Sequence, residues 1–402
     1  MSGPAPWTVQ ARWLFPADGP PVEGGTLTVA GDRILAVDPP GRRQLDLDLG
    51  NVALLPGLVN AHTHLDLGGL RDCRPPADDF VRWLRTVVAY RRSAPPGASE
   101  SAVRAGIAEC LAGGTTLVGD IAAGGTSGPL LAASPLRAVV FYELIGLTRT
   151  RAAQSWREAE AWLRTQRATP TCRPGLSPHS PYTVRRALFR LAVRRAVRDG
   201  LPLAIHLAET RAELEVLATH GGPLAAFLRE VGAWDEGGLA PNLDWIMRCC
   251  RPAETVLYAH GNYLGPAAGL RGSIVCCPRT HAAFGHAPHP FRELLARGVN
   301  VALGTDSLAS NPDLSILDEM RFLRRCHPDL PGAVILRMGT LAGAAALGWE
   351  RETGSLTPGK SADWITVPLD GADGDDPYEL LFASQHAVRD VCVRGEWVKT
   401  AS

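Results

Sequence analysis

The sequence predicts an α/β fold, a (β/α)8 TIM barrel with a small β-sandwich domain formed by both chain ends. Two observations predict it. Strand-like apolar runs alternate with amphipathic stretches from about residue 56 to 350, and short β-like runs separated by turns occupy the regions before and after. The 402 residues and the hydrophobic content of 46% suit a barrel with one smaller addition. We therefore expect residues 1–55 and 351–402 to form the sandwich and residues 56–350 to form the barrel.

Eight strand-like runs are expected to close the barrel. They are short apolar segments of the kind that a parallel sheet buries on both faces, at residues 58–64, 115–120, 137–144, 172–177, 202–206, 255–260, 273–277 and 300–306. Amphipathic stretches predict helices at residues 99–112, 152–166, 183–199 and 315–326. The β-like runs of the sandwich lie at residues 25–29, 34–37, 46–54, 361–367, 388–393 and 397–398.

Two histidines, His62 and His64, end the first barrel run. Alternate side chains of a strand share a face, so both imidazoles are expected to point the same way. Three later runs end in residues of similar chemistry, namely His206, His260 and Asp306. A barrel brings the carboxyl ends of its strands together, and imidazole with carboxylate suits zinc or another first-row divalent ion. The sequence therefore predicts a metal site at this end of the barrel.

The composition excludes several classes of function. Lys+Arg and Asp+Glu both total 41, so neither a nucleic-acid-binding face nor an acidic interaction tail is expected. No run approaches the roughly 20 apolar residues needed to cross a bilayer, so no membrane role is expected. The nine cysteines include no Cys-x-x-Cys spacing, and the start of the chain lacks an apolar signal core, which predicts a reduced, cytoplasmic protein. The expected partner is a small molecule.

Residues 354–361, GSLTPGKS, match the phosphate-loop pattern G-x-x-x-x-G-K-[ST]. That motif binds phosphate only where it follows a strand and opens a helix. Here a β-like run follows it, so we expect a turn between strands and no nucleotide site.

These residues resemble the amidohydrolase superfamily, in its branch of chlorohydrolases and nucleobase or nucleoside deaminases. The similarity runs nearly end to end. It is carried by LPGLVNAHTH at residues 55–64, HLAET at 206–210, GTDS at 304–307 followed by Ser310-Asn311, and GSLTPGKSAD at 354–363. The resemblance implies that one metal is held by His62, His64, His206 and Asp306, and that His260 contacts the attacking water. It also implies a possible homodimer.

One metal ion is expected. Relatives that hold two metals usually bridge them with a carboxylated lysine on a barrel strand, and the two lysines of this chain, Lys360 and Lys399, both follow the barrel. Zinc is the favoured ion, and iron and manganese also accept these ligands. Glu143 stays open as a possible bridge to a second metal, because a glutamate can also take that role.

Catalytic roles are expected for Glu209, His260 and Asp306. A divalent ion makes hydroxide available near neutral pH. Asp306 can then take a proton from water, His260 can orient the water, and Glu209 can protonate a ring nitrogen beside the attacked carbon. Deamination of an aromatic ring needs that acid, whereas amide or ester hydrolysis could proceed without it. A non-catalytic barrel module is the alternative, and it should have lost some of these residues.

Substrate contacts are expected in the strand-to-helix loops. The resemblance places His179 in this role, and Ser310 and Asn311 follow the last metal ligand. Arg279 and His281 stand where relatives often read Cys-Pro-x-Ser-Asn, and they suit an anionic or hydroxyl-bearing group. The RTH and FGH pieces between residues 279 and 286 resemble the branch that deaminates 6-aminodeoxyfutalosine in the futalosine route to menaquinone. Lesser candidates for its carboxylate are Arg82, Arg85, Arg149 and Arg151.

Other substrates stay open. Deamination of S-adenosylhomocysteine, methylthioadenosine or guanine, or dechlorination of a triazine, would keep the same metal ligands and differ only in the loops.

Overall fold

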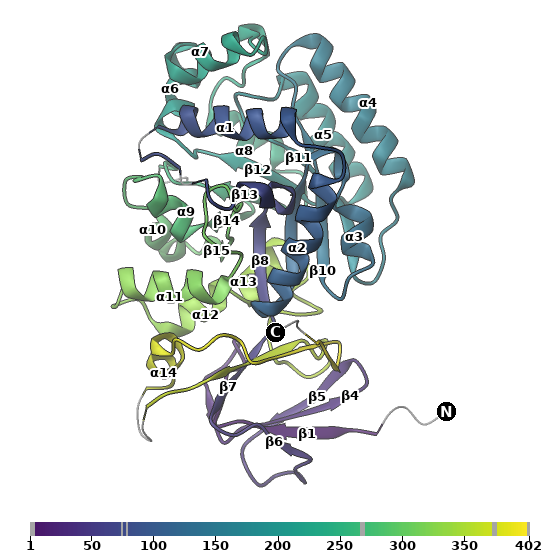
Figure 1. The fold of residues 1–402 in the computed structure, drawn as a ribbon, viewed down its shortest axis with the longest axis vertical. Coiled ribbons are helices and arrows are strands. Elements are labelled where there is room, and N and C mark those ends of the chain that lie inside the picture. Colours follow the sequence, from purple (N-terminus) through teal and green to yellow (C-terminus); the bar gives the residue numbers. More distant parts are fainter. Residues whose placement is uncertain (1–4, 74, 78, 266–269, 372–375, 400–402) are drawn as a thin grey trace.

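The computed structural model describes residues 5–73, 75–77, 79–265, 270–371 and 376–399. Eight parallel strands follow one another round a barrel in sequence order (Figure 1): β8 (Leu58–Thr63), β9 (Thr115–Ala122), β10 (Arg137–Leu144), β11 (Cys172–Pro178), β12 (Leu203–Leu207), β13 (Val256–His260), β14 (Ser273–Cys276) and β15 (Asn300–Leu303). The first and last strands meet through an isolated bridge between Thr63 and Asp306. The predicted barrel and its eight strands are confirmed.

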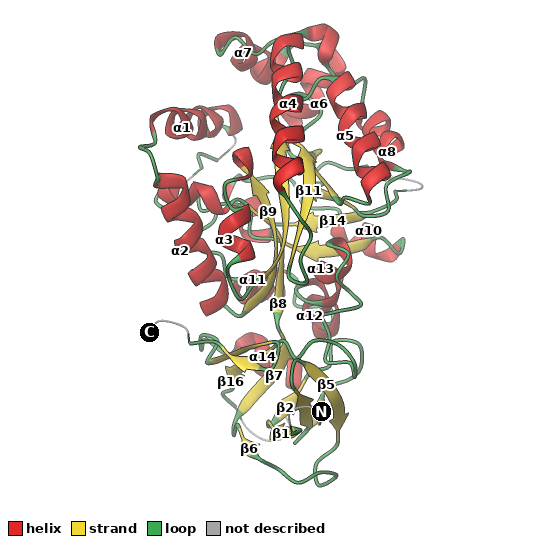
Figure 2. Ribbon diagram, turned by 90° about the vertical axis from the view of Figure 1, so that its right-hand side faces the viewer, coloured by secondary structure: helices red, strands yellow, loops and turns green. Residues whose placement is uncertain are grey.

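Helices surround these strands (Figure 2). They are α1 (Phe80–Ser93), α2 (Ala98–Ala112), α3 (Gly128–Ala132), α4 (Arg149–Thr165), α5 (Arg186–Asp199), α6 (Arg211–Thr219), α7 (Gly222–Glu230), α8 (Leu243–Cys250), α9 (Pro278–Ala283), α10 (Phe291–Ala296), α11 (Ile316–Cys326), α12 (Gly332–Met338) and α13 (Leu341–Ala346), with short 3-10 turns η1 (Leu65–Leu70), η2 (Ala123–Gly125) and η3 (Glu236–Gly238). The four helices predicted from amphipathic stretches are confirmed as α2, α4, α5 and α11. No helix in the described ranges is both long and apolar enough to cross a membrane.

The barrel interior is packed with small and branched apolar side chains. Val59, Val139, Phe141 and Leu257 are buried there with Trp349, which follows α13. The histidines and the aspartate predicted as a site lie beyond this apolar layer, at the carboxyl ends of the strands. Figure 1 shows α1 above those ends, on the side away from the smaller sheets.

The chain ends form two further sheets below the barrel (Figure 2). A four-stranded sheet contains β1 (Trp7–Gln10), β4 (Thr26–Ala30), β5 (Arg33–Asp38) and β6 (Leu47–Asp48). A six-stranded sheet contains β2 (Trp13–Leu14), β3 (Val22–Glu23), β7 (Val52–Pro56), β16 (Trp364–Pro368), β17 (Asp390–Val393) and β18 (Glu396–Trp397). In the sequence, α14 (Pro377–Ala383) connects β16 to β17.

The two small sheets pack against each other around one apolar cluster. It combines Val9 and Leu27 of the four-stranded sheet with Leu54 and Trp364 of the six-stranded sheet. β7 and β16 pair antiparallel over five residues, so segments from both chain ends share one sheet. The exact domain boundaries at residues 55 and 350 stay a prediction.

The phosphate-loop match lies between α13 and β16, and the next regular element is a strand. Lys360 turns back on its own loop, where its Nζ donates to Ser355 Oγ at 2.8 Å. No helix N-terminus is available for phosphate, as predicted. The prediction that the segment joins two strands was wrong, because a helix precedes it.

A buried ion pair ties the barrel to the six-stranded sheet. The guanidinium of Arg137, at the start of β10, donates to Asp363 at 3.2 Å and to Ser361 Oγ at 2.5 Å. We expect Arg137→Met to lower the apparent free energy of unfolding by about 3–5 kcal/mol, because it leaves the Asp363 carboxylate buried without its cation. Denaturant titration measures this loss. Arg198→Met, which removes an exposed pair with Asp199, is the control and should leave the denaturation midpoint unchanged; equal midpoints for both variants would contradict the prediction.

Candidate active site

Three histidines and an aspartate converge at the carboxyl ends of the barrel strands. His62 lies on β8 and His64 directly after it, His206 lies on β12, and Asp306 follows β15. The Nε2 atoms of His62 and His64 each lie 3.7 Å from Asp306 Oδ1, and His64 Nε2 lies 3.2 Å from His206 Nε2. His260, at the end of β13, completes a second group with His62 and His206, in which the ligand atoms lie within 4.8 Å of one another. The structure therefore brings together the residues that the sequence predicted for a metal site.

These residues fit a divalent metal ion. Both ring nitrogens of His62 and the Nε2 of His260 are buried without a hydrogen-bond partner, an arrangement that costs free energy unless another group satisfies those atoms. Two nitrogens bound tetrahedrally to zinc at about 2.0–2.1 Å would lie about 3.3 Å apart, close to the separation of His64 and His206. Burial lowers the pKa of His62, His64 and His260 well below the ordinary value and that of His206 to about 3. All four imidazoles are thus in the neutral form that binds metals.

The backbone at two of these residues is strained. His260 and Asp306 have φ values of 68° and 59°, in the left-handed region that only a few per cent of non-glycine residues adopt. Hydrogen bonds hold both in place: the carbonyl of His260 accepts from His289 Nε2 at 2.7 Å, and Asp306 donates its backbone N–H to the carbonyl of His62 at 3.0 Å. Strain of this kind is typical of a site whose geometry is fixed by its surroundings.

Glu209 lies beside this cluster, on the turn after β12. Its Oε1 is 3.4 Å from His260 Nε2. Burial, followed by the nearby carboxylates of Asp306 and Glu213, raises the pKa of Glu209 well above its ordinary value, which favours the protonated form of the side chain. Burial also raises the pKa of Asp306, to about 7. Two buried carboxyl groups with raised pKa values, Glu209 and Asp306, thus lie at this cluster, and Glu209 lies against the imidazole of His260.

Glu213 holds the turn that carries Glu209. Its two carboxylate oxygens accept the backbone N–H groups of Ala208 and Glu209 at 3.0 and 2.9 Å, and Ala208 has a positive φ of 53°. Sequence reasoning missed Glu213. Its signal was the spacing T-x-x-E from Thr210 to Glu213, which is typical of the first turn of a helix.

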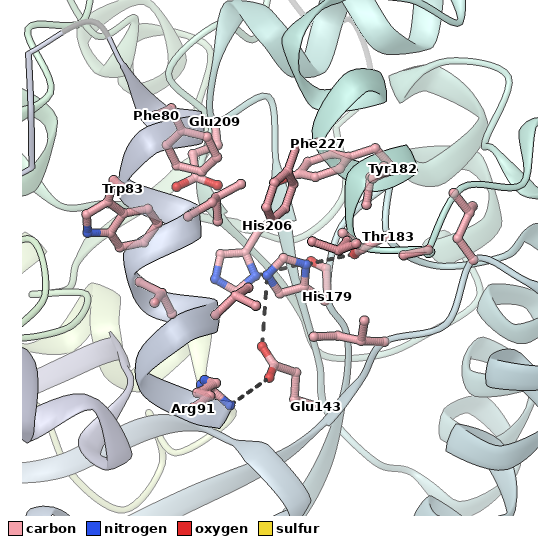
Figure 3. A pocket seen from close by; sticks show the side chains of 18 of the residues that line it. Phe80, Trp83, Arg91, Glu143, His179, Tyr182, Thr183, His206, Glu209 and Phe227 are labelled. Atoms are coloured by element: carbon pink, nitrogen blue, oxygen red, sulfur yellow. Dashed lines mark hydrogen bonds and ion pairs between the residues drawn. The ribbon is translucent and has the colours of Figure 1, made fainter. Parts of the chain in front are cut away.

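A pocket of about 460 Å³ opens onto these groups. Glu209, His260 and Asp306 are among its lining residues, and most of the other lining residues are apolar. Figure 3 shows His179 beside His206 in this wall. Thr183 Oγ1 lies 2.8 Å from His179 Nδ1, so Nε2 faces the pocket. Burial lowers the pKa of His179 to about 4, so the ring is neutral. His179 therefore lies where a substrate ring can reach it.

Helix α1 forms one side of the pocket and was not predicted. Phe80, Trp83 and Arg91 line it from this helix. Arg91 lies 3.2 Å from an oxygen of Asp66 and 3.6 Å from an oxygen of Glu143, and the other oxygen of Glu143 lies 3.9 Å from His179 Nε2 (Figure 3). Glu143 is thus held between a cation and an imidazole. Neither group of described residues that could hold a metal ion includes Glu143.

Four predicted substrate contacts lie outside the pocket wall. Arg279 is bound by Glu319 and Asp313, and His281 Nε2 lies 2.9 Å from the carbonyl of Ala287. Ser310 donates to Asp306, and Asn311 donates to Thr305 and Glu319. The structure therefore does not bring Arg279 and His281 to the pocket wall: the Arg279 guanidinium is paired with carboxylates, and the Nε2 of His281 lies against a backbone carbonyl. Of the four lesser arginine candidates, only Arg151 is among the described residues that line the pocket.

A TIM barrel with this cluster at the carboxyl ends of its strands defines a metal-dependent hydrolase. The chain belongs to the Amidohydrolase family, whose model matches residues 53–398. It is an enzyme of that family, a hydrolase of carbon–nitrogen bonds of the deaminase type.

Relatives with named activities support this class. The chain is 32% identical over 369 residues to an aminodeoxyfutalosine deaminase from Deinococcus radiodurans, covering 86% of this chain and 85% of that protein. It is also 32% identical over 375 residues to a 5-methylthioadenosine/S-adenosylhomocysteine deaminase from Syntrophobacter fumaroxidans, covering 87% and 81%. A crystal structure of an adenosine deaminase from Xanthomonas campestris with bound zinc superposes with a TM-score of 0.78 at 25% identity, covering 98% of this chain and 93% of that one.

Proposed function

We propose that this protein is a zinc-dependent deaminase that releases the C6 amino group of an adenine nucleoside as ammonia, with 6-aminodeoxyfutalosine as its preferred substrate. The observation that carries the proposal is the position of Glu209, a buried carboxyl group in the pocket wall that lies 3.4 Å from His260 Nε2. Simple hydrolysis of an amide does not need an acid there, whereas attack on an adenine ring does. The Deinococcus and Xanthomonas proteins, named as deaminases, support this chemistry.

The residues of the cluster have separate roles in the proposed reaction. His62, His64, His206 and Asp306 would hold the metal. A zinc ion bound there would lower the pKa of water from about 15.7 to about 7 and would so supply hydroxide at neutral pH. Asp306 takes the proton released from water, and His260 orients the attacking oxygen. Glu209 donates its proton to the ring nitrogen next to C6, which lets the ring accept the negative charge as C6 becomes tetrahedral. Asp306 then gives its proton to the amino group as the C6–N bond breaks and ammonia leaves. The proton left on the C6 hydroxyl returns to Glu209, so that C6 becomes a carbonyl carbon and both carboxyl groups regain their starting forms.

The pocket suits a nucleoside that carries an apolar ring with a negatively charged group attached to it. Its volume of about 460 Å³ lies within the usual range for small-molecule sites. The wall includes the apolar residues Phe227, Leu228 and Val231, and the exposed arginines Arg92 and Arg151 also line the pocket. A substrate with a carboxylate on an aromatic ring would pack the ring against these apolar side chains and would pair the carboxylate with the two arginines. The benzoate of 6-aminodeoxyfutalosine has this form, and the proposal places the enzyme in the futalosine route to menaquinone.

Ammonia release measures the proposed function. Zinc-replete protein is assayed with 6-aminodeoxyfutalosine, adenosine, methylthioadenosine and S-adenosylhomocysteine, and the ultraviolet shift from adenine to hypoxanthine is followed in parallel. We expect the highest kcat/KM with 6-aminodeoxyfutalosine. Preference for methylthioadenosine or S-adenosylhomocysteine would instead assign the activity named for the Syntrophobacter relative. Inactivity with all four would reject the nucleoside and leave guanine and chlorinated triazines as substrates to test.

The two exposed arginines can be tested separately. We expect Arg92→Gln/Arg151→Gln to raise KM for 6-aminodeoxyfutalosine about tenfold, because it removes charge-assisted contacts to the carboxylate. KM for methylthioadenosine, which carries no such group, should stay within about twofold. Arg149→Gln is the matched control, since Arg149 is exposed on the same helix as Arg151 but does not line the pocket. An equal rise in KM for both nucleosides would show that the arginines do not recognise an anion.

A further inference from the structure

Arg279 lies between two carboxylates behind the metal site. Its Nε donates to Glu319 Oε1 at 2.8 Å and its backbone N–H to Glu319 Oε2 at 3.0 Å. Its two terminal nitrogens donate to the two oxygens of Asp313 at 2.8 and 2.6 Å. Glu319 is fully buried, and the side chain of Arg279 is only 12% exposed. This paired geometry fixes both planar groups, and it fixes α9, which carries Arg279, against α11, which carries Glu319.

Glu319 extends this pair to the loop after β15. Its Oε1 accepts from Asn311 Nδ2 at 2.6 Å, and the same amide group donates to the carbonyl of Thr305 at 2.7 Å. The hydroxyl of Thr280, the residue after Arg279, lies 3.2 Å from the Thr305 carbonyl and 3.1 Å from Ser310 Oγ. All of these groups are buried or half-buried. The pair therefore reaches the peptide that precedes Asp306 by two routes.

The network ends on the carboxylate of Asp306. Ser310 Oγ donates to Asp306 Oδ2 at 3.0 Å, whereas Oδ1 faces His62 and His64 at 3.7 Å from each. Asp306 also has a strained φ of 59°, which persists only where the surrounding structure holds it. One oxygen is thus held by the protein while the other faces the cluster.

We propose that Arg279 and Asn311 are positioning residues, which act through Glu319, Thr305 and Ser310 to aim the carboxylate of Asp306 at the metal. Arg279 and Asn311 do not contact the substrate in this arrangement. The inference rests on the proposed function in one respect, the assignment of Asp306 as a metal ligand.

Two variants test the network. Arg279→Lys keeps the positive charge but loses the paired hydrogen bonds, and Asn311→Leu removes both amide donors at similar volume. The matched control is Arg137→Lys, which disturbs the buried ion pair between Arg137 and Asp363. This pair lies at the start of β10, at the end of the barrel that faces away from the histidine cluster. For each protein, zinc affinity is measured by competition with a chromophoric chelator, the thermal midpoint of the metal-free protein by calorimetry, and kcat and KM with 6-aminodeoxyfutalosine and methylthioadenosine.

Residues that orient metal ligands typically affect metal affinity or activity by about 10- to 100-fold. We expect Arg279→Lys and Asn311→Leu to weaken zinc binding by about this factor, and to lower kcat for both nucleosides alike with KM within about twofold. The control should lower the thermal midpoint of the metal-free protein while zinc affinity and kcat stay at wild-type values. Asp313→Asn, at the more exposed end of the network, should weaken zinc binding about two- to fivefold and remains informative if the other variants do not fold.

Two results would overturn the inference. A rise in KM confined to the carboxylate-bearing nucleoside would make Arg279 a substrate contact. Wild-type zinc affinity in all three network variants would make the network purely structural. If the wild-type protein deaminates none of the nucleosides, the proposed function fails, but the zinc affinities still decide whether Arg279 and Asn311 position Asp306.

Discussion

Glu209→Gln is expected to lower kcat for deamination by about 10²–10⁴-fold, the range usual for loss of a general acid or base. Glutamine has nearly the same shape as glutamate but carries no proton that it can transfer to a ring nitrogen. The wild-type carboxyl group is buried beside His260, and burial raises its pKa well above the ordinary value, which favours the protonated form. Because the residue is not among the predicted metal ligands, zinc content should be unchanged. Steady-state kinetics with metal analysis of the same preparation measures both quantities.

The control for this experiment is Glu215→Gln. Glu215 is exposed on α6, six residues after Glu209. The kcat of the Glu215→Gln enzyme should therefore match the wild-type value. If Glu209→Gln retained turnover with a full complement of zinc, Glu209 would not be the acid, and the argument for deamination over simple hydrolysis would lose its main support. If the variant lost both zinc and activity, Glu209 would instead belong to the metal site.

The convergence of the predicted histidines and Asp306 at one end of the barrel could be expected from the sequence because each of them ends an apolar run. A parallel barrel brings strand ends together whatever the lengths of the intervening helices. His62, His206 and His260 thus needed only correct strands to be placed. Their final arrangement depends on details that no pattern gives, such as the positive φ of His260 and Asp306.

The direction of Arg279 could not be predicted. The sequence places it just after the strand β14, where a residue can face the pocket or turn away from it. The outcome depends on Glu319, 40 residues later in the chain, whose carboxylate lies close to the start of α9. A buried carboxylate pairs with the nearest available cation because an unpaired buried charge is costly. The carboxylate that determines where the Arg279 side chain points therefore lies far from Arg279 in the sequence, and no local pattern indicates the pairing.

The wall formed by α1 was missed for a related reason. The strand–helix alternation predicts helices that cover the outside of a barrel, whereas α1 lies over the strand ends (Figure 1). The apolar side chains of Phe80 and Trp83 face the pocket. In sequence, such side chains are indistinguishable from core residues. The short strands β2 and β3 were also missed, since two residues carry no alternation pattern.

His206→Ala is expected to weaken zinc binding about 10²- to 10³-fold and to leave no detectable deamination at ordinary zinc concentrations. Apparent free energies of zinc binding of about 10–16 kcal/mol, shared among four ligands, correspond to about 2.5–4 kcal/mol for each ligand. His206 Nε2 faces His64 Nε2 at 3.2 Å, and its Nδ1 lies 3.1 Å from the carbonyl of His179. That second contact keeps Nε2 free of a proton and directed at the cluster. Alanine removes the ligand and its orientation together.

Zinc removal gives an independent measure of the same site. A ligand that binds only the folded protein stabilises it, by about 4.1 kcal/mol when its concentration is 1,000 times Kd. Chelation should therefore lower the thermal midpoint of the wild-type protein, and added zinc should restore both stability and activity. The His206→Ala protein should show the lower midpoint throughout and respond little to either treatment. His220→Ala is the control, because His220 is exposed and pairs with Glu236 away from the cluster. A His206→Ala protein that retained wild-type zinc affinity would show that the ion binds elsewhere, and the assignments of His62, His64 and Asp306 would then fail with it.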